Sequence, residues 1–209
     1  MTDLIPKHGG YEKLKSFQMA QIAYDFTFDF VKKYVPRNSR TCDQMEQAAR
    51  SGKQNIAEGS KASAVSKQTE LKLVNVARAS LEELLLDYRD FLRTHGLGQW
   101  AKDDARSVEI RRLAYRTNRT YTTYRTYMSD AEPAANCAIC LINQANYLLD
   151  QQLRVLEKDL TNNGDFKDHY KEARKKQMLN DGPSIDDFLK SVGLRRLENG
   201  RVVGLNDPD

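Results

Sequence analysis

The sequence predicts an all-α protein, and three observations indicate that fold class. Charged residues make up 30% of the 209 residues and apolar residues 40%, with five prolines, a balance typical of helix-rich proteins. Apolar residues recur at steps of three and four along several long segments. Proline, glycine or capping residues mark the ends of these segments. We therefore expect an antiparallel four-helix bundle with an insert between its third and fourth helices and a small C-terminal helical and hairpin appendage.

Three parts follow from this pattern. Residues 1–10 end in two glycines and should be a flexible arm. Residues 11–160 should form the bundle, with an insert at about 98–131. Residues 161–209 should form a C-terminal suffix with short helices and a hairpin.

The first helix is expected from about Tyr11 to Tyr34, because Pro36 bars its continuation. Its stripe steps by three and four residues through Tyr11, Leu14, Phe17, Gln21, Tyr24, Phe28, Val31 and Val35. Further apolar side chains lie beyond that stripe, namely Ala20, Ala23, Phe26 and Phe30. This surplus predicts a second interface with another subunit.

The second helix, Thr41 to Gly59, has an inner face of very small residues. Thr41 and Gln44 have the spacing of a capping box, which satisfies free backbone donors at a helix start. Glycine inside a helix costs about 1 kcal/mol relative to alanine, so Gly52 requires a neighbour packed hard against it. We expect this bare face to contribute to subunit contacts as well.

The third and fourth helices have the clearest patterns. Ser66 should cap the third helix, whose stripe runs from Leu71 to Leu92 and which should end at His95-Gly96. Asp130 and Pro133 mark the start of the fourth helix. Its stripe continues through Ala138, Ile142, Ala145, Leu149, Leu153, Leu156 and Leu160.

The C-terminal suffix contains three short elements. Phe166 to Leu179 can form a basic helix, and Ser184 should cap a helix that runs through Val192. Asn199-Gly200 then predicts a hairpin with a two-residue turn in which both central residues need positive φ. A lone hairpin is marginal in water, so it must dock on the bundle or on a partner, or remain disordered.

The insert is the main functional candidate, because arginines and tyrosines alternate in it. Arginine binds phosphate through two parallel hydrogen bonds, and tyrosine rings can stack on unpaired bases. The alternative is a helical hairpin whose arginines are solvated and whose tyrosines pack on the bundle. The proposed contact residues are Arg111, Arg112, Arg116, Arg119, Arg125, Tyr121 and Tyr124.

Charge is distributed unevenly along the chain. The net charge is +4 and the pI is near 8.9, which is too mild to indicate nucleic acid by itself. Residues 1–40 carry +3 and residues 96–133 carry +2. Basic residues near the ends of the first helix could extend the positive surface of the insert, although each could equally be a solvated side chain: Lys13, Lys15, Lys32, Lys33, Arg37 and Arg40.

Sequence features of other protein classes are missing. No apolar run approaches the ~20 residues that span a bilayer, and the N-terminus lacks a signal-peptide core. Three cysteines do not make a disulfide framework in a chain of this size. We therefore expect a cytoplasmic protein that is not bound to a membrane.

No enzyme, cofactor or metal signature is found. Cys137 and Cys140 have the spacing of a metal or redox pair, but no second pair completes a zinc site, and core packing is the expected role. His8, His95 and His169 are scattered, and adjacent acidic residues diverge on a helix. There is no P-loop, dinucleotide fingerprint or nucleophile elbow. We expect no enzymatic activity, no cofactor and no bound metal.

Several segments resemble a known family. Leu14 to Tyr34, the run Gln54-Asn55-Ile56-Ala57-Glu58-Gly59, and Leu71 to Gly96 resemble the bacterial four-helix bundle proteins encoded by intervening sequences in 23S ribosomal RNA genes. The basic insert and the segment from Asn136 to Leu153 resemble its longer members, which carry a C-terminal suffix. The family commonly has Ile-Pro-Ser before Asn55, where this chain has Gly52-Lys53-Gln54.

The resemblance implies a function as well as a fold. Similar proteins include accessory proteins of diversity-generating retroelements, which form five-subunit barrels, bind nucleic acid through basic surface and associate with a reverse transcriptase. The matched residues Asn55, Glu58 and Gly59 are structural and imply no chemistry. By resemblance, we expect a pentameric homo-oligomer.

Two functional hypotheses remain open. The first is a non-enzymatic, oligomeric nucleic-acid-binding scaffold, accessory to a reverse transcriptase or another RNA-handling enzyme. The second is a structural or protein-interaction oligomer that binds a partner through its C-terminal suffix. A nuclease would need converging carboxylates on a metal, and the sequence offers no such set.

Overall fold

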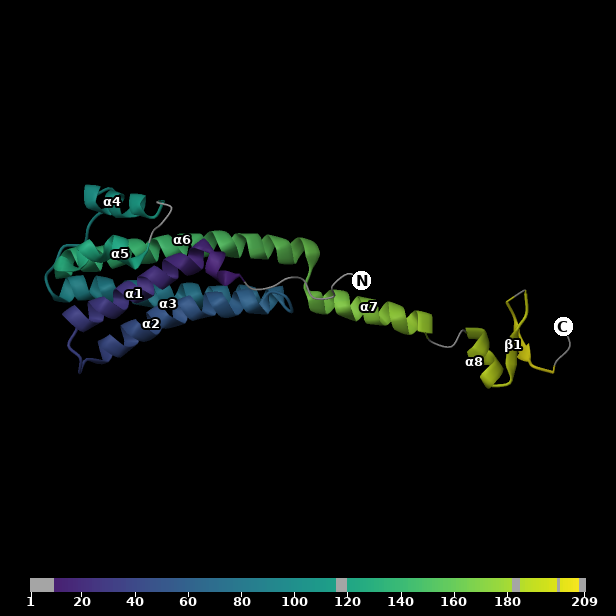
Figure 1. Cartoon of the computed structure of the whole chain (residues 1–209). Coiled ribbons are helices and arrows are strands. Elements are labelled where there is room, and N and C mark those ends of the chain that lie inside the picture. Colours follow the sequence, from purple (N-terminus) through teal and green to yellow (C-terminus); the bar gives the residue numbers. More distant parts are fainter. Residues whose placement is uncertain (1–9, 116–119, 182–184, 199, 207–209) are drawn as a thin grey trace. The chain divides into compact units, whose positions relative to one another are not determined.

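The computed structural model describes residues 10–115, 120–181, 185–198 and 200–206, and this part of the chain is predominantly helical (Figure 1). The only strands among these residues form one short hairpin near the C-terminus. This confirms the all-α class. The chain divides into two compact units, Met1–Phe166 and Lys167–Asp209. None of the described helices is long and apolar enough to cross a membrane.

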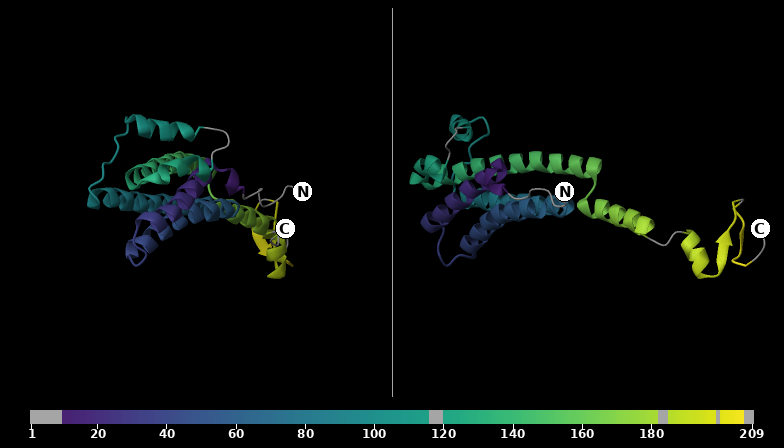
Figure 2. Two further views of the ribbon diagram at one scale, coloured as in Figure 1. Left: turned by 60° about the vertical axis from the view of Figure 1, so that its left-hand side comes forward. Right: turned by 45° about the vertical axis from the view of Figure 1, so that its right-hand side comes forward.

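Four long helices organise the first unit and share one apolar core. They pack in the pairs α1–α2, α2–α3, α3–α6 and α1–α6, and two views show them side by side (Figure 2). A 3-10 turn, Tyr11–Lys13, precedes them, and three short elements lie between α3 and α6: α4 (Ala105–Leu113), α5 (Tyr121–Tyr124) and the 3-10 helix η2 (Arg125–Ser129). The long helices are α1 (Lys15–Tyr34), α2 (Arg40–Ala62), α3 (Lys67–Thr94) and α6 (Ala131–Asn163).

The surplus apolar surface of α1 is used inside the chain. Phe26 and Phe30 are fully buried. The Phe30 ring centroid lies 4.8 Å from that of Tyr88 and 4.9 Å from that of Phe91, and Phe26 lies 6.2 Å from Tyr121 of α5. These two rings are not available to another subunit, so the expected role of Phe26 and Phe30 in a subunit interface is wrong.

Helix α2 begins one residue earlier than expected. Ser39 is its N-cap, and the Ser39 Oγ accepts a hydrogen bond from the Thr41 backbone N–H at 3.2 Å. The expected capping box at Thr41 and Gln44 is therefore wrong, because Ser39 already satisfies the free donor and Thr41 lies within the first turn.

The bare face of α2 is filled by α3. Leu81 packs directly over Gly52, and Glu70 and Leu73 lie against Gly59. The close neighbour expected at Gly52 is thus confirmed. Because α3 covers this face, the expected use of the α2 small-residue face in a subunit contact is also wrong.

The ends of α3 and α6 agree with the expected signals. Ser66 caps α3 by accepting from the Thr69 N–H at 3.2 Å, and Gly164, with φ 68°, follows α6. Asp165 adds a second cap, since its carboxylate accepts from the Ser66 hydroxyl at 2.9 Å and from the Lys67 N–H at 3.1 Å. This pair of bonds ties the end of α6 to the start of α3.

The second unit consists of α7, α8 and a hairpin. Helix α7 spans Phe166–Asp181 and α8 spans Ile185–Ser191, while strand β1 (Leu194–Arg196) pairs antiparallel with β2 (Val202–Gly204). The Leu197 N–H donates to the Arg201 carbonyl at 2.8 Å, which leaves three residues in the loop where two were expected. Gly200, with φ 84°, accommodates the extra residue. The expected cap Ser184 and turn residue Asn199 lie outside the described residues.

Candidate nucleic-acid interface

The insert begins with a clamp on the first turns of α6. Glu132 accepts hydrogen bonds from the Trp100 indole N–H at 3.0 Å and the Gly98 backbone N–H at 3.1 Å. Asn136, which is buried, accepts from the Trp100 backbone N–H at 2.7 Å and donates to the Gly98 carbonyl at 2.8 Å. The bond from Trp100, then that from Gly98, lowers the pKa of Glu132. The entry to the insert is therefore fixed by α6.

Helix α4 lies on the outer side of α6 (Figures 1 and 2). Ile110 is fully buried, and Ser107 and Leu113 are almost completely buried, at three-residue steps on the face toward α6. The Gln144 side chain of α6 donates to the Arg111 carbonyl at 3.3 Å. One face of α4 is thus a packed surface and the other faces solvent.

The exit of the insert is attached to α1. The Tyr34 hydroxyl and the Lys33 ammonium both donate to the Met128 carbonyl, at 2.8 and 2.7 Å, and Lys33 also reaches the Ser129 carbonyl. The Tyr121 hydroxyl donates to the Asp29 carboxylate. The connection between α4 and α5 is consequently held at both ends by long helices.

The arginines predicted as contacts lie in different environments. Arg112 is exposed at the end of α4, whereas Arg111 is partly buried and its guanidinium donates to the Lys102 carbonyl at 2.5 Å. Arg125 is exposed. Arg116 and Arg119 lie outside the described residues. Of the described arginines, only Arg112 and Arg125 present their side chains outward.

Arg125 has acidic neighbours. Burial, then the hydrogen bond to Asp29, raises the pKa of Tyr121 to about 12, while Arg125 lowers it and Asp25 raises it. Arg125 therefore lies beside two carboxylates of α1, which offset part of its charge. This makes Arg112 the stronger phosphate ligand of the two.

The two tyrosines named as stacking residues are part of the packing. Tyr124 is fully buried, so neither face of its ring is open to a base, and its expected role as a contact residue is wrong. Tyr121 is half-buried against Phe26 and bonded to Asp29. For these residues the alternative interpretation, tyrosines that pack on the long helices, describes the geometry.

Tyr115 is the aromatic residue that the contact list missed. It is 89% exposed, two residues beyond the last buried side chain of α4, Leu113. The signal was present in the sequence: Ile110 and Leu113 define the packed face, and Tyr115 falls off that face at helical spacing. Arg112 and Tyr115, three residues apart, form what we call the α4 tip.

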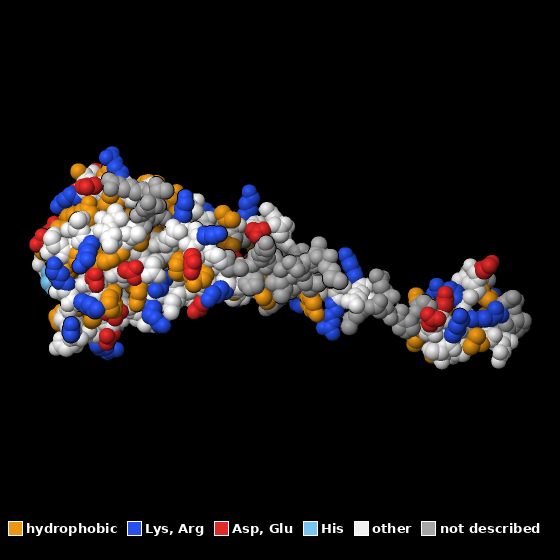
Figure 3. All heavy atoms as spheres, viewed as in Figure 1, with side chains coloured by type: hydrophobic (Ala, Val, Ile, Leu, Met, Phe, Trp, Pro, Cys, Tyr) orange, Lys and Arg blue, Asp and Glu red, His pale blue; other side chains and the backbone are white. Residues whose placement is uncertain are grey.

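The basic residues near the ends of α1 give no continuous positive surface. Lys33 is engaged with η2, and Lys32 lies over the Phe28 ring at 3.7 Å. Figure 3 shows Lys and Arg interspersed with Asp and Glu over the first unit. Lys13, Lys15, Arg37 and Arg40 are exposed, as solvated side chains would be.

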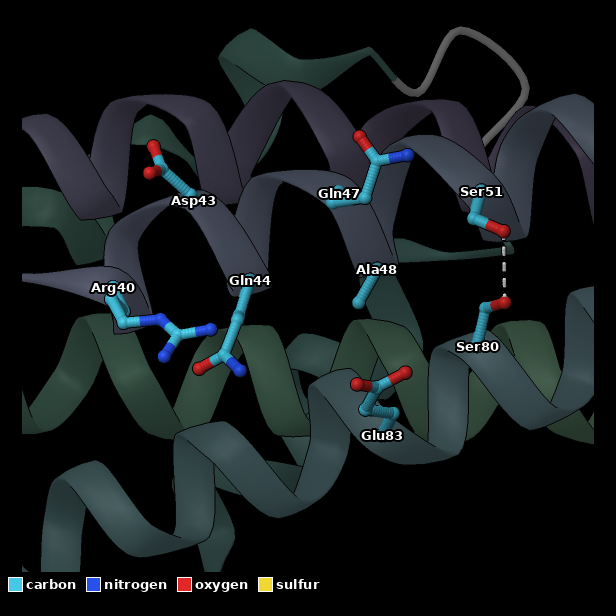
Figure 4. Close-up of a pocket in the computed structure, with 8 residues that line it drawn as sticks. All are labelled: Arg40, Asp43, Gln44, Gln47, Ala48, Ser51, Ser80 and Glu83. Carbon is cyan, nitrogen blue, oxygen red and sulfur yellow. Dashed lines mark hydrogen bonds between the residues drawn. The ribbon is translucent and has the colours of Figure 1, made fainter.

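A groove of about 450 Å³ between α2 and α3 is lined by polar side chains of both signs (Figure 4). Ser51 and Ser80 share a hydrogen bond of 3.0 Å across it. Its charges are balanced and its only cation is Arg40, so it does not suit a polyanion. The lining residues are Arg40, Asp43, Gln44, Gln47, Ala48, Ser51, Ser80 and Glu83.

Cysteine and acidic residues form no reactive cluster. Cys137 and Cys140 are buried in α6, which confirms their role in the core, and burial raises the pKa of both thiols. Among the described residues, no group of three histidine, cysteine or acidic side chains could hold a metal ion.

Comparisons with family models, with curated proteins and with solved structures found no match to this chain.

Proposed function

We propose that this protein is a non-enzymatic scaffold that binds nucleic acid through the α4 tip. The observation that carries the proposal is the 89% exposure of Tyr115 beside the exposed Arg112. Packing or a hydrogen bond to the core accounts for the other described tyrosines considered for stacking, Tyr121 and Tyr124. Tyr115 has no such structural role.

The chemistry of the α4 tip suits single-stranded or structured RNA. The Arg112 guanidinium can bind a phosphate through two parallel hydrogen bonds, and the Tyr115 ring can stack on an unpaired base. Arg116 and Arg119 follow directly in the sequence and add cations at the same place. Because α4 is fixed on α6 and α5 on α1, these groups stand on a rigid support, which is how binding loops are commonly presented.

The larger architecture belongs to the same proposal. The four long helices form an antiparallel four-helix bundle with residues 98–131 as its insert, as in the family that the sequence resembles. By that resemblance the protein is a cytoplasmic homo-oligomer, a ring of five, that accompanies a reverse transcriptase or another RNA-handling enzyme. No step of bond making or breaking is assigned to this chain.

The test is direct binding of structured RNA, single-stranded DNA and duplex DNA to the full chain and to the double variant Arg112→Ala/Tyr115→Ala. We expect the double variant to bind RNA at least tenfold more weakly. Arg93→Ala is the matched control, because Arg93 is an exposed arginine of α3, paired only with Asp90, and it lies outside the insert. Equal binding by the double variant and the control would exclude the α4 tip.

A second candidate function is favoured by the C-terminal unit. None of the described residues from 168 to 206 is buried, and apolar side chains reach the surface of this unit (Figure 3). A structural or protein-interaction oligomer that binds through residues 183–209 would use this surface. Under this function, deletion of 183–209 abolishes activity in the cell, whereas the Arg112→Ala/Tyr115→Ala variant retains it.

A further inference from the structure

Helix α8 carries an exposed apolar stripe, which we define as Ile185, Phe188 and Val192. These side chains are 62%, 58% and 52% exposed. Their spacing of three and four residues places them on one face of the helix. No other helix has three exposed large apolar side chains among its described residues. The stripe is therefore a concentrated feature and not a scattering of single residues.

The unit that carries the stripe has no core of its own among its described residues. Val202 and Leu205 of the hairpin are 47% and 45% exposed, and none of the described side chains of this unit is buried. Units of this size usually need a disulfide, a metal or association to be stable, and a two-stranded hairpin is marginal alone. Among the described residues there is neither a disulfide nor a metal cluster. Association is the remaining way to stabilise the unit.

The charges of α8 indicate what covers the stripe. Asp186 and Lys190, both exposed and four residues apart, flank the same side of it. In an antiparallel helix pair, equivalent flanks of the two helices face each other. With Phe188 of one copy opposite Phe188 of another, Asp186 of each copy lies opposite Lys190 of the other. Antiparallel pairing also opposes the two helix dipoles favourably.

We propose that the α8 stripe binds the α8 stripe of a second copy of this chain, antiparallel and about a twofold axis. The contact is self-complementary in shape and charge, as a twofold interface requires. It takes over the role first assigned to the apolar surfaces of α1 and α2, which are filled within the chain. The inference rests on the second candidate function and names its partner, and it is independent of the α4 tip.

The first test is the oligomeric state of the full chain, measured by sedimentation over a range of concentrations. The contact is small, so we expect association that weakens on dilution. Phe188→Asp should raise the dissociation constant at least tenfold. Val155→Asp is the matched control, because Val155 is 68% exposed on α6, and it should leave association unchanged. A chain that stays monomeric at every concentration, or a Phe188→Asp variant that associates normally, overturns the proposal.

A charge exchange distinguishes a second copy from a different protein. Asp186→Lys alone and Lys190→Asp alone each place like charges opposite each other and should weaken association several-fold. The double variant restores both pairs, and so does an equimolar mixture of the two single variants. Weak association of both the double variant and the mixture contradicts self-pairing. If deletion of 183–209 then still abolishes cellular function, the second candidate function survives with a different partner.

Discussion

Leu81 of α3 occupies the space beside Gly52 of α2 so completely that a Cβ on Gly52 would lie 2.6 Å from Leu81 Cδ2 and 2.7 Å from Cγ. Leu81 is fully buried, so it has little room to move. Two helices can approach this closely only where one of them lacks a side chain. The glycine therefore determines how tightly α2 and α3 pack.

Gly52→Ala should destabilise the protein. Overpacking a core costs about 1 to 3 kcal/mol, and the better helix propensity of alanine returns up to about 1 kcal/mol. We expect a net loss of about 1 to 2 kcal/mol in the free energy of unfolding, measured by urea denaturation. Gly98→Ala is the control, since a Cβ there meets Glu132 only at ordinary contact distance, 3.6 Å. A gain in stability for Gly52→Ala contradicts this account of the α2–α3 contact.

The hydrogen bond between Tyr88 and Thr27 should be worth keeping only as a pair. The buried Tyr88 hydroxyl donates to Thr27 Oγ1 at 3.0 Å, and Thr27 donates to the Ala23 carbonyl at 2.8 Å. Thr27→Val leaves the tyrosine hydroxyl without its acceptor and should cost about 1 to 3 kcal/mol. Adding Tyr88→Phe should recover most of that loss. A double-mutant cycle with no coupling energy would mean that the bond contributes nothing.

Asp87 should make the protein less stable as pH rises from 4 to 7. Burial, then the charges of Glu83 and Asp90, raises the pKa of Asp87 to about 6. An unfolded aspartate titrates near 3.9, so the folded state holds this proton more tightly. The resulting stability is fully present below about pH 4 and is lost as pH rises through about 6.

Asp87→Asn removes this ionisation. At pH 7 it should raise the free energy of unfolding by about 1 kcal/mol, a figure reduced for the partial exposure of the carboxyl group. Thermal unfolding at several pH values measures both effects. The exposed Asp103→Asn variant should keep the pH dependence of the parent. Identical pH profiles for parent and Asp87→Asn contradict the assignment.

Glu132→Ala should loosen the insert without unfolding the long helices. The change removes the acceptor of the Trp100 and Gly98 N–H groups. We expect faster amide hydrogen exchange over residues 98–113, with less than about 1 kcal/mol change in global stability. Glu157→Ala, an exposed glutamate of α6, provides the comparison. Unchanged exchange over 98–113 would show that the clamp does not hold the insert.

Much of the fold could be predicted from local sequence. The helical stripes of α1, α3 and α6 have the correct period, and Ser66, Gly96 and Gly164 mark the termini because capping chemistry is local. The requirement of Gly52 for a close neighbour also followed from helix propensity. Which helix would supply that neighbour did not, because an apolar stripe indicates a buried face without naming its partner.

The candidate site was harder to predict for the same reason. Tyrosine has an apolar ring and a polar hydroxyl, so Tyr115 and Tyr124 look alike in sequence. One is 89% exposed and the other fully buried. Arg111 and Arg112 are adjacent, yet only one donates to a backbone carbonyl of the insert. These differences arise from the tertiary packing of α4 on α6, which weak periodicity could not reveal.

The most direct test of the central claim is the salt dependence of RNA binding by the parent chain and by Arg112→Ala. If Arg112 contacts a phosphate, the slope of log K against log salt should fall in magnitude by about 0.7 to 0.9 in the variant. The slope for Arg93→Ala should equal that of the parent. Absence of binding by the parent at moderate salt, or equal slopes for all three proteins, would contradict a phosphate-binding α4 tip.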